Sequence, residues 1–592
     1  MSLDILPEID GLLLAAVLFP LLWASALAIE SFRRTLLELA PLAGLPALVV
    51  ALLGPPDHLE VYDGLLLGSR FVLDDLGGLF LAVVAFVWIL AGFFSRGREP
   101  KRRRGVRYFV FFLLTMSGNL GVVVARDLPG FLFFFSLMGL SSYGLVAHRQ
   151  TPEALRAAKI YMAFLILGEA LLYAGSVWAA TDAGSLSVES IARAIDASPN
   201  RGAIAALIVS GFGIKAGFVP LHVSLPPAYR AAPEPAAAVL SGAMTKAALL
   251  GWMLFLPAGI STVAPLGHIF VFGGIVAIYY GVLVGLFQES AKAMLAYSSI
   301  SQIGFMTLII GFGLLEPQLW PSAKVAVAIY ALHHALNESA LFLGVRVARD
   351  VRPDTAWLVK LGLILPALAL AGAPLSSGAV AKHALKGVVE SAASAGAQWL
   401  VALVSLGAVG TAVLMVRFLY AVWPSSRREH PIARPGLEAR RWVPWALLVI
   451  AATFSVWMLW WYPLEAASGE VLKWSAVASQ MWPLGVAAAL VMAVVAARDR
   501  LRWIVDRRIP TGDLLVPILA AWWWLLRRAD WVAGKCSGCW RWIVAQLTAT
   551  LERRSGPIQR MRRLEAVLSR WHVGATLLML TAATLFALLW WF

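Results

Sequence analysis

Long blocks of hydrophobic residues alternate with short polar segments along most of this chain. The blocks are about 17–25 residues long, the length that a helix rising 1.5 Å per residue needs to cross roughly 30 Å of hydrocarbon. The pattern therefore predicts an all-α polytopic membrane protein with about sixteen transmembrane helices. They are expected at 11–29, 37–54, 76–95, 108–125, 128–147, 158–180, 203–221, 236–257, 267–287, 293–315, 324–346, 360–381, 398–423, 443–463, 475–496 and 573–592.

Charge is distributed unevenly between the loops. Basic loops follow predicted helices 1, 3, 5, 11 and 13, whereas the opposite loops PPDHLEVYDG and YPLEAASGEV are acidic. Because Lys and Arg concentrate in cytoplasmic loops, the N-terminus is expected outside and the basic loops in the cytoplasm of a bacterium, with the spans in its inner membrane. The acidic leader SLDILPEID has no basic segment and no cleavage site, so we expect the first helix to be retained.

Residues 497–572 interrupt the hydrophobic blocks before the last predicted span, 573–592. Apolar residues, including many Trp, recur there at helical spacing with Arg on the other face, which is typical of an amphipathic helix at a membrane surface. We predict a lateral amphipathic helix on the cytoplasmic side, with a C-terminal anchoring helix after it. A lipid anchor is one interpretation, but the length of the segment favours contacts with neighbouring subunits.

Composition agrees with a membrane protein, since 60% of the 592 residues are hydrophobic and only 14% are charged. Soluble domains have about 25% charged residues. The net charge of +15 lies in the loops that set topology, so it does not indicate nucleic-acid binding. Cys536 and Cys539 supply at most half of a tetrahedral zinc site, and small residues on a helix face are the simpler interpretation. We expect no metal and no cofactor.

Ionisable residues within the predicted spans are few, and each costs several kcal/mol unless it is paired or hydrated. The candidates for a proton path are Lys215, Lys246, His334, Lys382, Glu169 and Glu338, with His333, Lys292, Lys386, His222 and Arg417 as further candidates. Simpler interpretations exist for some of them: Lys246 could snorkel, His333 could be a packing residue, and Lys386 and Arg417 could lie near the interface. Lys215 and Lys382 have the weakest alternatives.

Lys215 and Lys382 share a context of helix-breaking residues. Gly213, Gly217 and Pro220 surround the first lysine, and Gly372, Pro374 and Gly378 precede the second. Interrupted helices at corresponding places of two halves indicate a transporter built from repeats. Each interrupted helix is the fourth of five, which predicts two inverted five-helix repeats, helices 4–8 and 9–13, with helices 7 and 12 broken.

The same reasoning divides the chain into six parts. They are helices 1–3 (1–100), the first repeat (105–257), the second repeat (265–423), helices 14–15 (440–496), the lateral segment (497–572) and the anchoring helix (573–592). A buried lysine near a carboxylate can take up and release protons, so Lys, His and Glu side chains joined by waters would form a proton wire.

Four segments resemble the antiporter-like subunits of complex I, membrane-bound hydrogenases and multisubunit Na⁺/H⁺ antiporters. KAGFVPLHVSLPPAYRAAPEPAAAVLSGAMTKAALLGWMLFLP resembles helices 7–8 of that family, LAYSSISQIGFM helix 10, HALNESALFLG helix 11 and LAGAPLSSGAVAKHAL helix 12. The resemblance covers about residues 75–420. The segment 497–572 with the span after it resembles the lateral arm of the distal complex I subunit.

The resemblance assigns a role to five residues. It implies that Lys215 is the central proton carrier, that His334 is a middle link and that Lys382 connects to the outside. Lys246 matches a helix 8 lysine found in some members, and Lys292 matches a lysine in the turn before helix 10. We therefore expect a proton-translocating subunit that works with other membrane and soluble subunits.

Two positions depart from the family pattern. Ser136 stands where the family has a helix 5 glutamate that pairs with the helix 7 lysine, and Glu338 stands where helix 11 usually has a lysine. Glu169 on helix 6 is the intramembrane acid nearest in sequence, so we hypothesise that it replaces the missing partner of Lys215.

Several functions stay open at this point. Transport of protons, or of Na⁺, within a larger energy-coupled complex is favoured, since the sequence contains no cysteine set for iron–sulfur clusters and no nucleotide loop of its own. The chain would then be a translocase subunit without a redox or hydrolytic site. The alternatives are a degenerate antiporter fold with a structural, partner-docking role, and the membrane subunit of an inorganic-carbon uptake complex.

Overall fold

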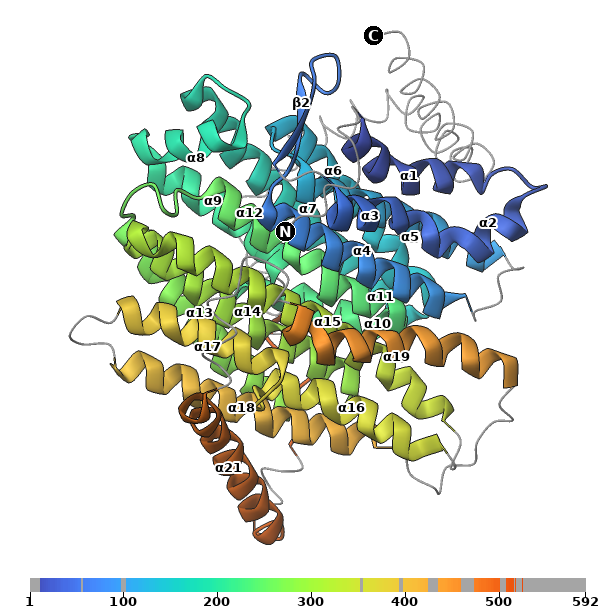
Figure 1. The fold of residues 1–592 in the computed structure, drawn as a ribbon, viewed down its shortest axis with the longest axis vertical. Helices are drawn as coiled ribbons and strands as arrows, with labels where there is room; N and C mark the ends of the chain where they lie inside the picture. The colour runs from blue at the N-terminus through green and yellow to red at the C-terminus, as the bar shows by residue number, and fades with distance from the viewer. Residues whose placement is uncertain are drawn as a thin grey trace, which may run out of the picture.

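A computed structural model describes residues 11–54, 57–96, 103–351, 355–392, 398–423, 435–458, 473–500, 507–515, 517 and 524. Most helices lie side by side in one bundle (Figure 1). In this described part, eleven helical segments are long and apolar enough to cross a membrane, and Leu12–Ala26 and Ala356–Ala371 are shorter apolar helices. The prediction of a helical multi-pass protein is confirmed.

The N-terminal part contains helices and one hairpin. The helical elements are α1 (Leu12–Ala26), α2 (Arg33–Leu39), the 3-10 helix η1 (Ala40–Gly44), α3 (Leu45–Leu53) and α4 (Asp75–Ser95). Strands β1 (His58–Tyr62) and β2 (Ser69–Leu73) pair antiparallel, with His58 opposite Leu73. The buried carboxylate of Glu60 accepts hydrogen bonds from the backbone N–H groups of Leu13 (2.8 Å) and Leu14 (3.2 Å), so it caps α1, where a negative charge is favoured.

The next helices contain most of the first predicted repeat. They are α5 (Arg103–Val124), α6 (Leu128–Val146), η2 (Ala147–Arg149), α7 (Pro152–Ala183), α8 (Val188–Ala197), α9 (Arg201–Ala216), η3 (Leu221–Ser224), α10 (Leu225–Ala231), α11 (Glu234–Val239), the π-helical turn η4 (Leu240–Met244) and α12 (Thr245–Phe255). The amphipathic helix α8 and the hairpin were not predicted, because neither is a hydrophobic block.

The remaining described helices follow in the same order as the predicted blocks. They are α13 (Ala264–Leu286), α14 (Ala291–Leu315), η5 (Pro317–Leu319), α15 (Trp320–Asp350), α16 (Ala356–Ala371), α17 (Ser377–Ala392), α18 (Gln398–Val422), α19 (Pro435–Met458) and α21 (Trp474–Ala496). The most apolar stretch of each span differs in burial. It is 94% buried in α14 and in the continuous helix Glu234–Phe255, but only 11% buried in Ala476–Ala496. The centre of the bundle therefore lies at α11–α12 and α14.

Two of the helices that carry the predicted breaks end at glycines with a left-handed backbone. Gly217 (φ 90°) follows α9 and Gly372 (φ 86°) follows α16, before α17 begins at Ser377. A Cβ at Gly372 would lie 2.7 Å from Lys382 Cδ, so the break also needs a residue without a side chain. The block predicted at 360–381 is therefore two helices, and the second continues to Ala392.

Ion pairs connect the five basic loops to one another, which shows that these loops lie at the same end of the bundle. The pairs are Arg96–Glu38 (2.8 Å), Arg440–Glu38 (3.8 Å), Arg441–Asp350, Arg349–Glu234 (3.8 Å) and Arg149–Glu234 (3.0 Å). Ion pairs that are partly exposed contribute at most about 1 kcal/mol each, so they serve here as markers of position. We call this end of the molecule the basic end.

Three expectations fall wholly or mostly outside the described residues. The C-terminal span 573–592 and the pair Cys536 and Cys539 lie outside them, and of the lateral segment 497–572 only 497–500, 507–515, 517 and 524 are described. The lateral helix therefore stays a prediction.

Candidate functional site

Lys215 lies in the last turn of α9, directly before the break at Gly217. Its side chain is 3% exposed and its Nζ donates a hydrogen bond of 3.1 Å to the hydroxyl of Tyr161 on α7. The ammonium also lies 5.5 Å from the centre of the Tyr161 ring. The Tyr161 hydroxyl is 3.1 Å from Ser142 Oγ on α6, so three helices meet at this lysine.

Glu169 on α7 faces α6 at the position of the missing glutamate. Its carboxyl group is close enough to Lys215 for an electrostatic interaction, but no ion pair joins the two side chains. Among the described residues, Glu169 Oε1 has no hydrogen-bond partner. A Cβ on Gly139 would lie within 2.4 Å of Glu169 Oε1, so the glycine leaves the room that the carboxyl group occupies. Glu169 and Lys215, the two residues that we paired by hypothesis, thus lie near each other without a direct contact, and their pairing stays a proposal.

Lys246 lies in the first turn of α12, directly after the π-helical turn. Its side chain is 1% exposed and its Nζ donates to the carbonyl of Ser241 (3.1 Å) and to Thr245 Oγ1 (3.2 Å). The same nitrogen contacts Nδ1 of His334 on α15. A snorkelling lysine would reach for the interface, whereas this one is directed into the bundle. π-helical turns are frequent at functional sites because they redirect side chains.

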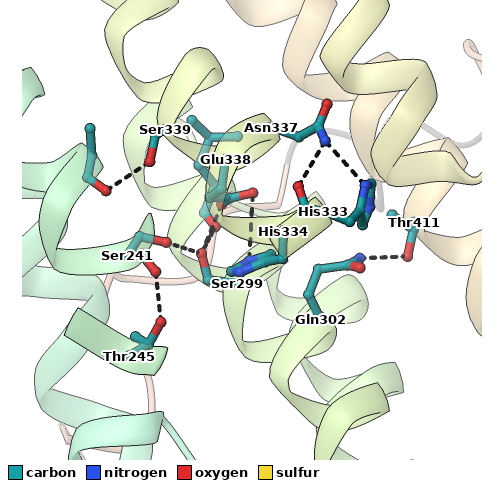
Figure 2. A network of polar contacts seen from close by, with 12 residues as sticks. Ser241, Thr245, Ser299, Gln302, His333, His334, Asn337, Glu338, Ser339 and Thr411 are labelled. Atoms are coloured by element: carbon teal, nitrogen blue, oxygen red, sulfur yellow. Dashed lines mark hydrogen bonds and ion pairs between the residues drawn. The ribbon is translucent and has the colours of Figure 1, made fainter. Parts of the chain in front are cut away.

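A polar network continues from His334 (Figure 2). Glu338 Oε2 lies 3.9 Å from His334 Nε2, which is an ion-pair distance, and Oε1 accepts a hydrogen bond of 2.7 Å from Ser299. Ser299 Oγ is also 2.7 Å from Ser241 Oγ. Helices α12, α14 and α15 are thus linked around one buried acid, Glu338, with one lysine and one histidine beside it.

His333 points to the other side of α15, toward α17. Its Nδ1 lies 2.9 Å from Ser377 Oγ, and Asn337 Nδ2 is 3.1 Å from both the same ring nitrogen and the serine. His333 is close enough to interact electrostatically with Lys246 and Lys382. Adjacent residues on one helix therefore serve two networks, since His334 faces α12 and His333 faces α17.

Lys382 occupies the second break, on α17. It is 7% exposed, and its Nζ donates to the carbonyls of Leu370 (3.0 Å) and Ala371 (2.7 Å) at the end of α16. The last carbonyls of a helix have no partner within it and attract a cation, so the break itself binds the lysine. Phe305 of α14 lies 6.0 Å from the ammonium.

The remaining candidates lie outside this central group. Lys292 Nζ donates to the Ala232 carbonyl (2.5 Å) between α10 and α11, which is a structural contact at the basic end. Lys386 is half-buried and interacts with Glu390. Arg417 is half-buried near Arg508. His222 is fully buried in η3 and is considered again below.

Sequence reasoning did not select the neutral partners of these charges. They are Ser142, Tyr161, Ser241, Thr245, Ser299, Asn337 and Ser377, together with Gln302, which accepts a bond of 2.8 Å from Tyr330 and lies 3.4 Å from Thr411. Hydroxyl and amide side chains are common in membrane helices. A search restricted to polar residues one helical turn from each buried charge would have found several of them.

A many-helix membrane protein with ionisable groups buried along its centre is the class that the fold and the site define. A model of the family described as NADH:quinone oxidoreductase/Mrp antiporter, transmembrane, matches residues 125–411. This segment contains most of the buried charges described above. The resemblance predicted from the motifs is confirmed by this match, which covers residues 125–411.

Relatives and solved structures agree with that assignment. NADH-quinone oxidoreductase subunit N of Desulforudis audaxviator is 29% identical over 417 residues, which cover 64% of this chain and 79% of the relative. A Na(+)/H(+) antiporter subunit of Alkalihalophilus pseudofirmus is 26% identical over 423 residues, with 68% of this chain and 83% of the relative covered.

Hydrogenase-4 component B of Escherichia coli is 27% identical over 329 residues, and the match spans 51% of this chain and about half, 48%, of that relative. The structure of the Mrp complex from Dietzia sp. DQ12-45-1b contains a chain that matches with a TM-score of 0.72 and 22% identity, covering 88% of this chain and 60% of that one. At this identity the likeness shows the fold, and the relatives so named are subunits of larger complexes.

Proposed function

We propose that this chain is a proton-translocating subunit of a larger energy-coupled membrane complex. The observation that carries the proposal is the contact between Lys246 and His334, with the acid Glu338 beside them, in the most buried part of the bundle. Three ionisable groups that each carry or release a proton lie within reach of one another there. Such groups are expensive in a membrane and persist where they have a function.

The first half of the path runs from Lys215 to Lys246. The hydroxyl of Tyr161 holds Lys215 at the break, and movement of the nearby Glu169 carboxyl group away from the lysine would favour release of its proton. The proton then passes to Lys246, whose Nζ contacts Nδ1 of His334. Hydroxyl groups of Ser142, Ser241 and Thr245 line this route and can each donate and accept.

The second half runs from His334 through His333 to Lys382. The two histidines are adjacent on α15, and His333 leads to Ser377 at the start of α17, the helix of Lys382. The separation of 3.9 Å between His334 and Glu338 exceeds a hydrogen bond, so transfer there needs a bridging water or a rotation of the ring. The positive-inside rule makes the basic end cytoplasmic and the N-terminus external, so Lys382 opens to the outside.

Two inverted five-helix repeats are the architecture that we propose for the path. The breaks at Gly217 and Gly372 support it, because each lies in the predicted helix that is fourth in its set of five. Gly217 follows Lys215 directly after the last turn of α9, and Gly372 lies against Lys382. The energy comes from partner subunits. The segment 497–572 is proposed to contact them along the basic end.

Transport by the purified complex in proteoliposomes tests the proposal. Lys246→Ala should lower proton uptake, followed with an internal pH-sensitive dye, by at least about 100-fold, as the loss of a proton-transfer group does elsewhere. Lys324→Ala is the matched control, because Lys324 is an exposed lysine of α15. Normal uptake by the Lys246 variant would exclude the path. Repeating the assay with and without Na⁺ distinguishes the transported ion.

A structural, partner-docking role is the second candidate, and Ser136 favours it because the family glutamate is absent there. Glu169 opposes it, since its carboxyl group takes the place beside Ser136 and interacts with Lys215. A docking subunit would tolerate Lys215→Ala and Lys382→Ala with full activity of the complex. Copurification of a soluble zinc protein would instead support inorganic-carbon uptake.

A further inference from the structure

The segment 507–515 follows α21 and returns to the basic end of the bundle, where it is fixed to three helices. The Ile509 N–H donates to the carbonyl of Phe287 (3.3 Å), and Gln288 Nε2 donates to the carbonyl of Ile509 (3.1 Å), beyond the end of α13. Thr511 Oγ1 bonds to Gln288 Oε1 (3.0 Å) and accepts from Arg230 of α10 (3.1 Å). These contacts determine where Asp513 lies.

Asp513 accepts hydrogen bonds from two tyrosines of the membrane helices. The hydroxyl of Tyr297 on α14 donates to Asp513 Oδ1 (2.8 Å), and that of Tyr280 on α13 donates to Oδ2. Gly512 allows this approach, because its backbone is left-handed (φ 84°) and a Cβ there would lie 2.9 Å from Pro227 Cγ. An acid from outside the spans is thereby inserted between α13 and α14.

His222 lies behind the same two tyrosines. It is fully buried in η3, the turn that follows the break after Lys215. Its ring lies 4.9 Å from the ring of Tyr280 and 6.4 Å from that of Tyr297, and it interacts electrostatically with Asp513. Among the described residues, neither of its ring nitrogens has a hydrogen-bond partner, which is unusual for a buried imidazole.

The charges around Asp513 are otherwise paired with one another. Arg508 forms an ion pair with Glu289 (3.4 Å), and Arg230 forms one with Glu153 (3.4 Å) in addition to its bond to Thr511. The tyrosine hydroxyls therefore provide the direct contacts of the Asp513 carboxylate. Asp513 is half-buried, so its carboxylate is open to water on one side and faces the tyrosines in front of His222 on the other.

We propose that Asp513 is a proton-path residue at the mouth of the first half-channel, and that it exchanges protons between the basic-end solution and His222. The carboxylate takes up one proton from water, passes one to a ring nitrogen of His222 with the tyrosine hydroxyls between them, and returns to its charged form. His222 then passes the proton toward Lys215, which lies on the other side of the break at Gly217. This inference rests on the proposed function, and it assigns an acid to the entrance of the first half-channel.

Proteoliposomes that contain the intact complex test it, with rates normalised to assembled complex. Asp513→Asn keeps the shape and an acceptor for the tyrosines but carries no proton, so uptake should fall at least about tenfold. Asp513→Glu should restore most of it. Glu153→Gln, which removes a neighbouring exposed acid and leaves the contacts of Asp513 in place, should retain most of the rate. His222→Gln combined with Asp513→Asn should be no slower than the slower single variant.

The outcomes separate this inference from the proposed function. Wild-type uptake by Asp513→Asn, or an equal fall in Glu153→Gln, would overturn the role of Asp513 as a proton carrier. Multiplicative effects of the Asp513 and His222 substitutions would show that the two do not share a path. Uptake that survives Lys215→Ala in the same preparation would instead overturn the proposed function.

Discussion

The two helix breaks of this protein hold their lysines in different ways. Lys215 at the first break donates to a side chain, the hydroxyl of Tyr161, with the acid Glu169 nearby, whereas Lys382 at the second break is bound by the backbone carbonyls of Leu370 and Ala371. A carboxyl group on a rotatable side chain can move, but helix-end carbonyls stay in place. In the proposed proton path, the first lysine is therefore the one that is switched, and the second holds a proton at a fixed exit.

Removing the lysine of the first break should have the largest effect. Lys215→Ala is expected to lower proton uptake by the reconstituted complex at least about 100-fold, because no other described cation lies at that break. Lys215→Arg should fail as well, since an arginine does not release its proton. Activity of the arginine variant would mean that charge alone is required there.

Neutralising Glu169, the acid near the first break, should lower proton uptake by a similar factor. Glu169→Gln removes the switch and keeps the shape, so uptake should fall about as far as in Lys215→Ala. The double variant Glu169→Gln with Ser136→Glu returns a carboxyl group to the neighbouring helix and should recover part of the rate. Unchanged uptake by Glu169→Gln would show that Lys215 works without a carboxylate.

The second break should respond less to loss of its lysine. Lys382→Met leaves the carbonyls of α16 in place, where water can bind them, so we expect a fall of about tenfold in uptake. Measuring the uptake rates of Lys382→Met and Lys215→Ala in the same assay tests whether the two lysines have different roles, one as a switch and one as an exit. Equal losses at the two breaks would show that both lysines are switched in the same way.

The smallest effect is expected from the glycines that end the helices. Gly217→Ala and Gly372→Ala each place a side chain in the left-handed region, which costs about 1–2 kcal/mol and should lower the melting temperature of the complex by a few degrees. Only the second also displaces its lysine, since the new Cβ would lie 2.7 Å from Lys382 Cδ. A reduced transport rate in Gly217→Ala but not in Gly372→Ala would contradict this account.

Hydropathy predicted most of the described helices, because a span must be both long and apolar. It missed α8 and the hairpin β1–β2, which lie at the ends of the bundle and carry mixed residues. The break inside 360–381 was expected from Gly372 and Pro374, but the continuation of α17 to Ala392 was not. Its residues, such as Lys386 and Glu390, are polar enough to end a hydrophobic block.

The chemistry of the site was predicted in part. Lys215, Lys246, His334 and Lys382 were selected because a buried charge is rare and costly, and each is buried in the structure. Asp513 could not be selected that way, since it lies in the polar stretch RRIPTGD outside every predicted span. Its place depends on contacts with residues more than two hundred positions earlier in the chain.

The sequence by itself determined the class of protein, the order of the spans, the shared side of the basic loops and the identity of the buried charges. All of these follow from local composition, because the cost of placing a charge or a free backbone group in hydrocarbon depends on the residue and its near neighbours. Only the tertiary structure decided which charge meets which partner. Lys215 reaches Tyr161, Lys246 reaches His334, and Asp513 reaches the tyrosines before His222, since helix packing brings together positions that the chain keeps far apart.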